Sequence, residues 1–325
     1  MSKNDNGSKD VRGPLFLQAN ELHSEGKYFE TLDFASAVIC TSSNDREIVD
    51  ALSMKASCYD SLGTHELELK TLDQALARFG EAEDGEIKMM VAWFHYNKGI
   101  VLADLGDDGG AVASYDSAIE RARVADATES DRLRAMAMFN RAAQLRRGKS
   151  DAEARAGLRS LIAEFEGTDD TELLKQVARA RSSLGQTLFA EGNMEAARAE
   201  FDSLFAMRPE ILSQVPEPMT TSSKVMRAVI NGMSDQTEEA AASLLNEARV
   251  LKNSREPQDR RLYAVASSMA AFVLSQIGEQ EKSSSTLKAA REFLIDDESA
   301  LKILESASST LFDNSGGGEA AVKLR

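Results

Sequence analysis

Cysteine, proline, histidine and tryptophan are scarce in this chain of 325 residues, which holds 2 Cys, 5 Pro, 3 His and 1 Trp. Two cysteines cannot build a disulfide framework, and the small and apolar neighbours of Cys40 and Cys58 predict buried, reduced thiols. The few prolines, and the lack of runs of Val, Ile and Thr that alternate with polar residues, favour helices over strands. The histidines, His23, His65 and His95, lack the ligand spacing of a metal site, so no metal is predicted.

Long apolar runs and an excess of positive charge are also missing. The most apolar stretch, 263–274, is shorter than the ~18 apolar residues that a membrane span needs. The polar residues 1–10 lack the apolar core of a signal peptide. A net charge of −15 opposes binding to nucleic acid or to an anionic membrane. We therefore expect a cytoplasmic protein without nucleic-acid or membrane partners.

Catalytic and cofactor-binding motifs are absent as well. The sequence has no glycine loop that would cradle a phosphate, no dinucleotide-binding fingerprint and no nucleophile elbow. His65 and Glu66 begin like a zinc-protease motif, but Leu69 stands where the second histidine is required. These absences predict a protein that is not an enzyme and carries no cofactor.

An internal repeat is the feature that the sequence does contain. A small residue is followed three positions later by a large apolar residue, and four positions after that by a turn glycine. The clear instances are Ala56, Tyr59 and Gly63; Gly99, Leu102 and Gly106; Gly185, Leu188 and Gly192; and Ala271, Leu274 and Gly278. They are separated by 43 residues or by twice that number. Weaker instances are those at Ala19, at Ala142, where Gly148 comes one residue early, and at Ala228, where Asp235 replaces the turn glycine.

A second pattern follows the turn in two of these repeats. Ala111, Tyr115 and Ala118 have the same spacing as Ala197, Phe201 and Leu204, and this spacing places each set on one face of a helix. Each repeat is therefore predicted to be a helix hairpin with small residues at the crossing of its helices. A single hairpin leaves an apolar face uncovered, which the stacking of neighbouring hairpins would bury.

These residues resemble the tetratricopeptide repeat, most fully in Gly185, Leu188, Gly192, Ala197, Phe201 and Pro209. The resemblance covers residues 14–295 and implies an all-α, right-handed superhelix of about seven hairpins. The family repeat has ~34 residues, so a 43-residue repeat implies longer helices. Pro216 and Pro218 are expected to interrupt the helices within 214–223. We further predict a disordered N-terminus at 1–13, a capping helix at 296–312 and a flexible tail at 313–325.

The resemblance also implies that the first helix of each hairpin lines a concave face. Aromatic, amide and arginine side chains there would suit a segment of a partner protein or peptide, as anchors, as backbone hydrogen-bonding groups and as carboxylate ligands. The candidate groove residues are Trp93, Tyr96, Asn97, Phe139, Asn140, Arg146, Arg179, Gln186 and Phe189. The alternative is that the aromatic residues Trp93, Tyr96 and Phe139 are ordinary core between long helices.

A basic segment suggests what such a partner would carry. Residues 131–159 hold eight basic residues against three acidic ones, within an acidic chain. An acidic segment of a partner, or of other copies of this chain, would be attracted to it, whereas the alternative is a solvated helix face. The sequence thus predicts a protein-binding adaptor, with a peptide- or ligand-sensing regulatory subunit and a self-associating scaffold as alternatives.

Overall fold

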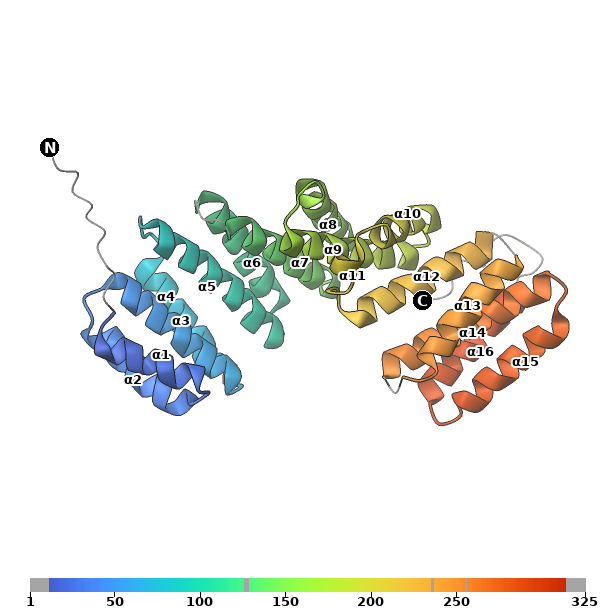
Figure 1. Ribbon diagram of the computed structural model, residues 1–325, viewed down its shortest axis with the longest axis horizontal. Helices are drawn as coiled ribbons and strands as arrows, with labels where there is room; N and C mark the ends of the chain where they lie inside the picture. Colours follow the sequence, from blue (N-terminus) through green and yellow to red (C-terminus); the bar gives the residue numbers. More distant parts are fainter. Residues whose placement is uncertain (1–11, 126–128, 235–236, 255, 314–325) are drawn as a thin grey trace. The chain divides into compact units, whose positions relative to one another are not determined.

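The computed structural model describes residues 12–125, 129–234, 237–254 and 256–313, and all of the regular structure in these residues is helical (Figure 1). The first helices are α1 (Pro14–Ser24), α2 (Tyr28–Thr41), α3 (Asp45–Ser61), α4 (His65–Phe79), α5 (Gly85–Asp104), α6 (Asp108–Val124), α7 (Ser130–Arg147) and α8 (Asp151–Phe165). The others are α9 (Thr171–Ala190), α10 (Met194–Phe205), α11 (Pro209–Leu212), α12 (Glu217–Ser234), α13 (Glu238–Leu251), α14 (Pro257–Gln276), α15 (Gln280–Phe293) and α16 (Glu298–Asp313). None of the described helices combines the length and apolar character needed to cross a membrane.

The chain forms two compact units, of which the first covers Met1–Gly157 and the second Leu158–Arg325. In unit 1, successive cores join α1 to α3, α3 to α5, and α5 to α7, so each hairpin shares its apolar face with the first helix of the next. In unit 2, one core lies between α9 and α11, and a larger one joins α12 to α16. This sharing of cores is the stacking that the repeat pattern predicted, and the all-α fold is as expected.

The first helix of five described hairpins ends in the same left-handed turn at a glycine. In the second hairpin, the Gly63 N–H donates to the Asp60 carbonyl at 2.8 Å and the Thr64 N–H donates to the Tyr59 carbonyl at 2.9 Å. This pair of bonds is the Schellman motif, which needs a residue with positive φ, and Gly63 has φ of 65°. The large apolar residue of the repeat is therefore the residue whose carbonyl oxygen accepts the second of these two hydrogen bonds.

The turn after α7 keeps this geometry without a glycine at the left-handed position. Lys149 has φ of 63°, whereas Gly148 only caps the helix. The expectation that Gly148 marks this turn one residue early was thus wrong, because the backbone keeps its spacing and places a lysine in the strained position. Left-handed residues stand at Gly63, Gly106, Lys149 and Gly192, each 43 residues after the one before. The predicted Asp235 turn lies outside the described residues.

Glycine on the first helix makes room for an aromatic ring on the second. A Cβ atom built on Gly99 would lie 2.6 Å from the Tyr115 ring, and one on Gly185 would lie 2.5 Å from the Phe201 ring. Both rings are fully buried. The small residues of the repeat therefore set how closely the two helices of a hairpin approach, as predicted.

Three expectations about helix ends and burial need correction or restriction. Pro216 and Pro218 break the helices only briefly, because α12 begins at Glu217 and proline is tolerated in a first turn. Cys58 is buried, but Cys40 is exposed, because the buried face of α2 contains Thr31, Ala35 and Val38 and Cys40 lies off that face. The segments predicted as a disordered N-terminus and a flexible tail lie largely outside the described residues. Helix α16 packs on α14 and buries Ala300, Leu304, Ala307 and Leu311.

Candidate functional site

The repeat spacing predicts inner positions on α5 and α7 of unit 1. Trp93 is partly buried against the core between α5 and α7, and Asn97, one helical turn later, is also partly exposed. Ile100 follows with 36% of its surface exposed. On α7, Asn140 is partly exposed and Arg146, near the end of the helix, is exposed. We call the surface made by Trp93, Asn97, Ile100, Asn140 and Arg146 the inner face of unit 1.

Two of the predicted groove aromatics belong to the core. Tyr96 is 7% exposed and Phe139 is 8% exposed. The Tyr96 ring packs between Trp93, at a centroid distance of 5.6 Å, and Tyr115, at 5.9 Å. Tyr96 and Phe139 thus sit where the core alternative placed them, and Trp93 is the aromatic residue that reaches the surface.

The amide of Asn140 is tied to that core. Its Nδ2 donates to the Tyr96 hydroxyl at 3.0 Å, across the gap between α7 and α5. The Asn140 side chain also forms a hydrogen bond with the Tyr115 side chain. The Asn97 amide, in contrast, has no hydrogen bond within the described part of the chain. The Asn97 amide therefore remains for a ligand on the inner face.

Three arginines of the basic segment form ion pairs with neighbouring carboxylates. Arg141 pairs with Asp116 at 2.6 Å, Arg134 pairs with Asp131 at 2.6 Å, and Arg147 pairs with Asp108 at 3.4 Å. Two of these partners, Asp108 and Asp116, lie on α6 and so come from outside the segment. A count of charges along the sequence therefore overstates the positive charge that this surface presents.

The groove residues predicted on α9 belong to unit 2 and differ in character. Arg179 donates to Gln176 at 2.8 Å, and Gln186 donates to the Ser182 hydroxyl at 3.1 Å. Ser182 is buried and shares a hydrogen bond of 2.9 Å with Ser223 of α12. Phe189 packs partly buried against the core that joins α12 to α16.

The inner row of side chains thus differs among these hairpins. Tyr96 and Phe139 stand three residues before the small residue in unit 1, whereas Ser182 and Ser268 have this position in unit 2. Ser268 is buried, like Ser182, and donates to the Leu304 carbonyl of α16 at 3.2 Å. Of the nine residues predicted for the groove, the six of unit 1 lie on α5 and α7, and the three of unit 2 lie on α9.

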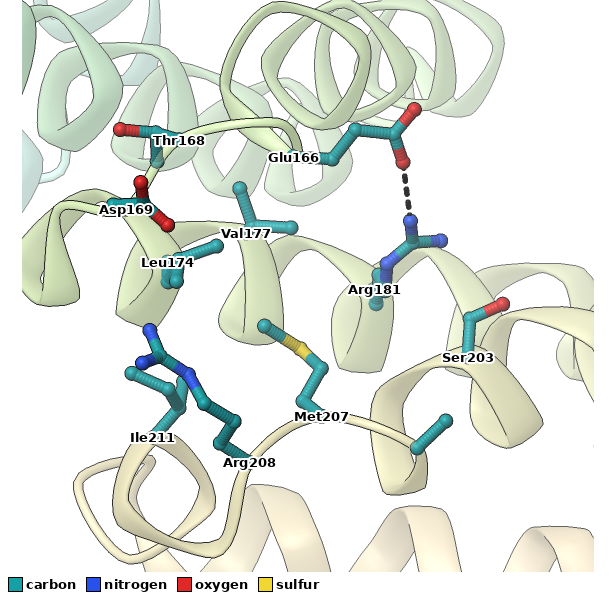
Figure 2. A pocket seen from close by; sticks show the side chains of 11 residues that line it. Glu166, Thr168, Asp169, Leu174, Val177, Arg181, Ser203, Met207, Arg208 and Ile211 are labelled. Carbon is teal, nitrogen blue, oxygen red and sulfur yellow. Dashed lines mark hydrogen bonds and ion pairs between the residues drawn. The ribbon is translucent and has the colours of Figure 1, made fainter.

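A pocket of about 510 Å³ opens in unit 2 between α9, the end of α10 and the turn before α11 (Figure 2). Leu174, Val177 and Ile211 give it an apolar wall. Arg181 stands at one side and donates to Glu166 at 2.5 Å and to Glu200 at 3.0 Å. Arg208 lines the pocket, is exposed, and forms no ion pair with the described residues.

The polar side chains that line this pocket include Arg181 and Ser203. The Arg181 charge is balanced by two carboxylates, and Ser203 is not hydrogen-bonded to any group that would activate its hydroxyl among the described residues. This pocket was not predicted from the sequence. Its one signal was Arg208 directly before the helix-starting Pro209.

A second group of side chains was also missed. Asp60, His65 and Glu68 bring one ligand atom each to within 4.8 Å of one another at the turn between α3 and α4. Sequence spacing concealed it, because Asp60 precedes the turn while His65 and Glu68 follow it. No metal was predicted, because the histidines lack ligand spacing along the sequence, and the structure places Asp60 and Glu68 close to His65.

Comparison with known proteins identifies the fold. No family model and no curated protein matches the sequence. The C-terminal part of a TPR repeat-containing protein from Cytophaga hutchinsonii is similar with a TM-score of 0.60 at 15% identity, over 88% of this chain and 98% of that chain. The apo form of RapI is similar with a TM-score of 0.60 at 12% identity, over 92% of this chain and 84% of that chain.

A third similar structure is the apo form of the quorum sensor NprR from B. thuringiensis, with a TM-score of 0.51 at 12% identity over 86% of each chain. The fold is therefore a helical repeat of the tetratricopeptide kind, as the turn residues predicted. The repeat length of 43 residues is not set by these similarities. It stays a prediction that the spacing of the left-handed turns supports.

Proposed function

We propose that this chain is a non-catalytic module that binds a segment of another protein or peptide on the inner face of unit 1. The observation that carries the proposal is the placement of Asn97, whose unbonded amide lies on the same face of α5 as Trp93 and Ile100. An asparagine amide can donate to and accept from the backbone of an extended peptide. A partly buried Trp and an exposed Ile are suitable anchors for its side chains.

The net charge of −15 bears on the choice of partner. Repulsion opposes an acidic segment, and Arg134, Arg141 and Arg147 of α7 already have carboxylate partners. We therefore expect amide and apolar contacts to supply most of the affinity. Binding should then depend only weakly on salt concentration.

A peptide- or ligand-sensing regulatory subunit is the second candidate. NprR, to which the fold is similar, is described as a quorum sensor. The pocket in unit 2, with Arg208 on an apolar wall, is the feature that would take a small anionic ligand. We propose a cytoplasmic location, which is compatible with both candidate functions.

Peptides selected against the purified chain from a random display library would test the proposal. Wild type and the variants Ile100→Asp and Asn97→Ala would be compared by fluorescence polarisation with the selected peptides. We expect both variants to weaken binding at least about 10-fold, because a charge or a truncated amide removes contact with the peptide. Val124→Asp is the matched control, since Val124 is an apolar residue of α6 with 66% of its surface exposed.

Two outcomes would contradict the inner face as the site. One is that Ile100→Asp binds like wild type while helicity is unchanged. The other is that no peptide is selected and light scattering shows self-association, which would favour the scaffold alternative. Binding that is lost in Arg208→Glu but kept in Ile100→Asp would move the site to the pocket of unit 2.

A further inference from the structure

The turn between α3 and α4 holds three metal-ligating side chains on a fixed backbone. Asp60 lies in the last turn of α3, and His65 is the first residue of α4. The Schellman bonds at Gly63 and Thr64 connect them through a rigid turn. Glu68 lies three residues after His65, and this spacing places both side chains on one face of α4.

The side chains converge without satisfying one another. The Nδ1 atom of His65 and the Oε2 atom of Glu68 are 3.6 Å apart, which is too long for a hydrogen bond. Both atoms are buried, and neither has a hydrogen-bond partner among the described residues. The Glu68 side chain is only 7% exposed. A buried carboxylate oxygen without a partner is costly, so its presence calls for a ligand.

The charge at this place points to a cation. Asp60 repels Glu68, and Asp104 at the end of α5 adds to the repulsion. His65 offsets this repulsion only when its ring is protonated. Two carboxylates directed at one point are stable there when a positive ion lies between them.

We propose that Asp60, His65 and Glu68 form a site for a divalent transition-metal ion, with Zn²⁺ as the ion that fits this donor set. One imidazole nitrogen and two carboxylate oxygens are ligands that Zn²⁺ accepts, whereas Mg²⁺ and Ca²⁺ prefer oxygen alone. Three protein ligands leave a fourth position for water or another group.

The observed spacing allows the site to close. Ligand atoms of a tetrahedral zinc site are roughly 3.3 Å apart, since each lies about 2.0 Å from the metal. His65 and Glu68 at 3.6 Å are already near this value. Asp60 is exposed, so its side chain is free to change rotamer and move toward the other two.

Metal binding would link the end of α3 to the start of α4. The ion would bind the folded hairpin and not the unfolded chain, so it would raise the stability of the second repeat. The proposed peptide site on α5 and α7 does not depend on this ion.

Isothermal titration of the full chain with ZnCl₂, after treatment with EDTA and dialysis, tests the site. We expect one Zn²⁺ per chain, an upward shift of the melting temperature, and no such shift with MgCl₂. Co²⁺ should show the visible absorption of a four-coordinate ion. In His65→Ala and Glu68→Gln, the affinity for Zn²⁺ should fall at least about 10-fold.

The two variants and their controls separate the site from other causes. Glu68→Gln keeps the shape and removes a buried charge, so it should fold at least as well as wild type without metal. His23→Ala removes another histidine of unit 1, and Cys40→Ser removes the exposed thiol, so both should bind Zn²⁺ like wild type. No saturable binding, or equal binding by wild type and Glu68→Gln, would overturn the proposal. Loss of binding in Cys40→Ser instead would assign the ion to the thiol and would also overturn it.

Discussion

The Tyr115 ring occupies the space that a side chain at position 99 would need: a Cβ built on Gly99 would lie 2.6 Å from its Cε1 atom. The ring cannot move aside easily, because Tyr115 is 2% exposed and packs against Tyr96 at 5.9 Å. We predict that Gly99→Ala lowers the free energy of unfolding by about 1–2 kcal/mol. The clash costs about 1–3 kcal/mol, and the higher helix propensity of Ala offsets up to about 1 kcal/mol of it.

The second hairpin suggests how to restore the packing. It has Ala56 and Leu72 at the positions of Gly99 and Tyr115, and both are buried in one core. The double variant Gly99→Ala, Tyr115→Leu should therefore be more stable than Gly99→Ala in urea unfolding. Gly85→Ala is the control on the same helix, because nothing lies within 4 Å of a Cβ there. A Gly99→Ala variant as stable as wild type would contradict the steric explanation.

The left-handed lysine at the α7–α8 turn gives a second prediction. A side chain at positive φ costs about 1–2 kcal/mol relative to glycine, and Lys149 has φ of 63°. Lys149→Gly should raise the free energy of unfolding by about 0.5–1 kcal/mol, since glycine also loses more entropy on folding. Lys149→Ala removes the same charged side chain but keeps a Cβ, so it should give no such gain. Equal effects of the two variants would show that the lysine side chain, not the backbone, matters.

These two cases show where sequence reasoning on the fold succeeded and where it ended. The small residue, the apolar residue and the glycine were visible as a pattern, because each has a separate steric task in the hairpin. Lys149 was hidden, since only the backbone keeps the spacing there and the residue type does not show it. Cys40 was misplaced because apolar neighbours in sequence do not fix which helix face is covered.

Burial of His95 predicts a dependence of stability on pH. Burial, with Arg121 and Lys98 nearby, lowers the pKa of His95 from 6.5 to about 4. Between these values the unfolded chain binds a proton that the folded chain does not, so stability falls as the pH drops from 6.5 to 4. The ring is partly exposed, so after allowing for solvent screening we expect a loss of about 1–2 kcal/mol.

The variant His95→Gln isolates this contribution. Denaturant unfolding of wild type and variant between pH 7 and pH 4 should show a shallower decline for the variant, because glutamine does not titrate. Other groups affect both proteins alike and cancel in the difference. If stability declined with pH equally in wild type and variant, His95 would have the same pKa in the folded and unfolded chain, against the prediction.

The bond from Asn140 to Tyr96 can be measured by a double-mutant cycle. Tyr96→Phe and Asn140→Ala each remove the hydrogen bond of 3.0 Å. We expect a coupling energy of about 0.5–1.5 kcal/mol from urea unfolding of the two single variants and the double variant. Additive losses would show that water replaces the bond without cost.

The two thiols should react at very different rates. Cys40 is exposed, whereas Cys58 is buried, and burial raises its pKa to about 11. A thiol reagent should therefore modify one cysteine of the native chain rapidly and the second only after unfolding. In Cys40→Ser the rapid reaction should disappear. Two rapid thiols in the native protein would contradict the burial of Cys58.

The candidate site was predicted less completely than the fold. Spacing from the small residue located Trp93, Asn97 and Asn140 on partly exposed positions of α5 and α7. It could not show that Tyr96 and Phe139 are covered, since burial there depends on how closely the next helix packs. The metal-ligand cluster escaped because its members come together only through the three-dimensional path of a turn.

The pairing of glycine with an aromatic ring also limits how these repeats can diverge. Gly99 with Tyr115 and Ala56 with Leu72 are two ways of filling one space, and each is compatible with the hairpin. Replacing only one residue of a pair by its counterpart from the other pair overfills the space or leaves a cavity. The substitutions are therefore epistatic, and a lineage passes between the two solutions most readily when a more stable background tolerates the mismatched intermediate.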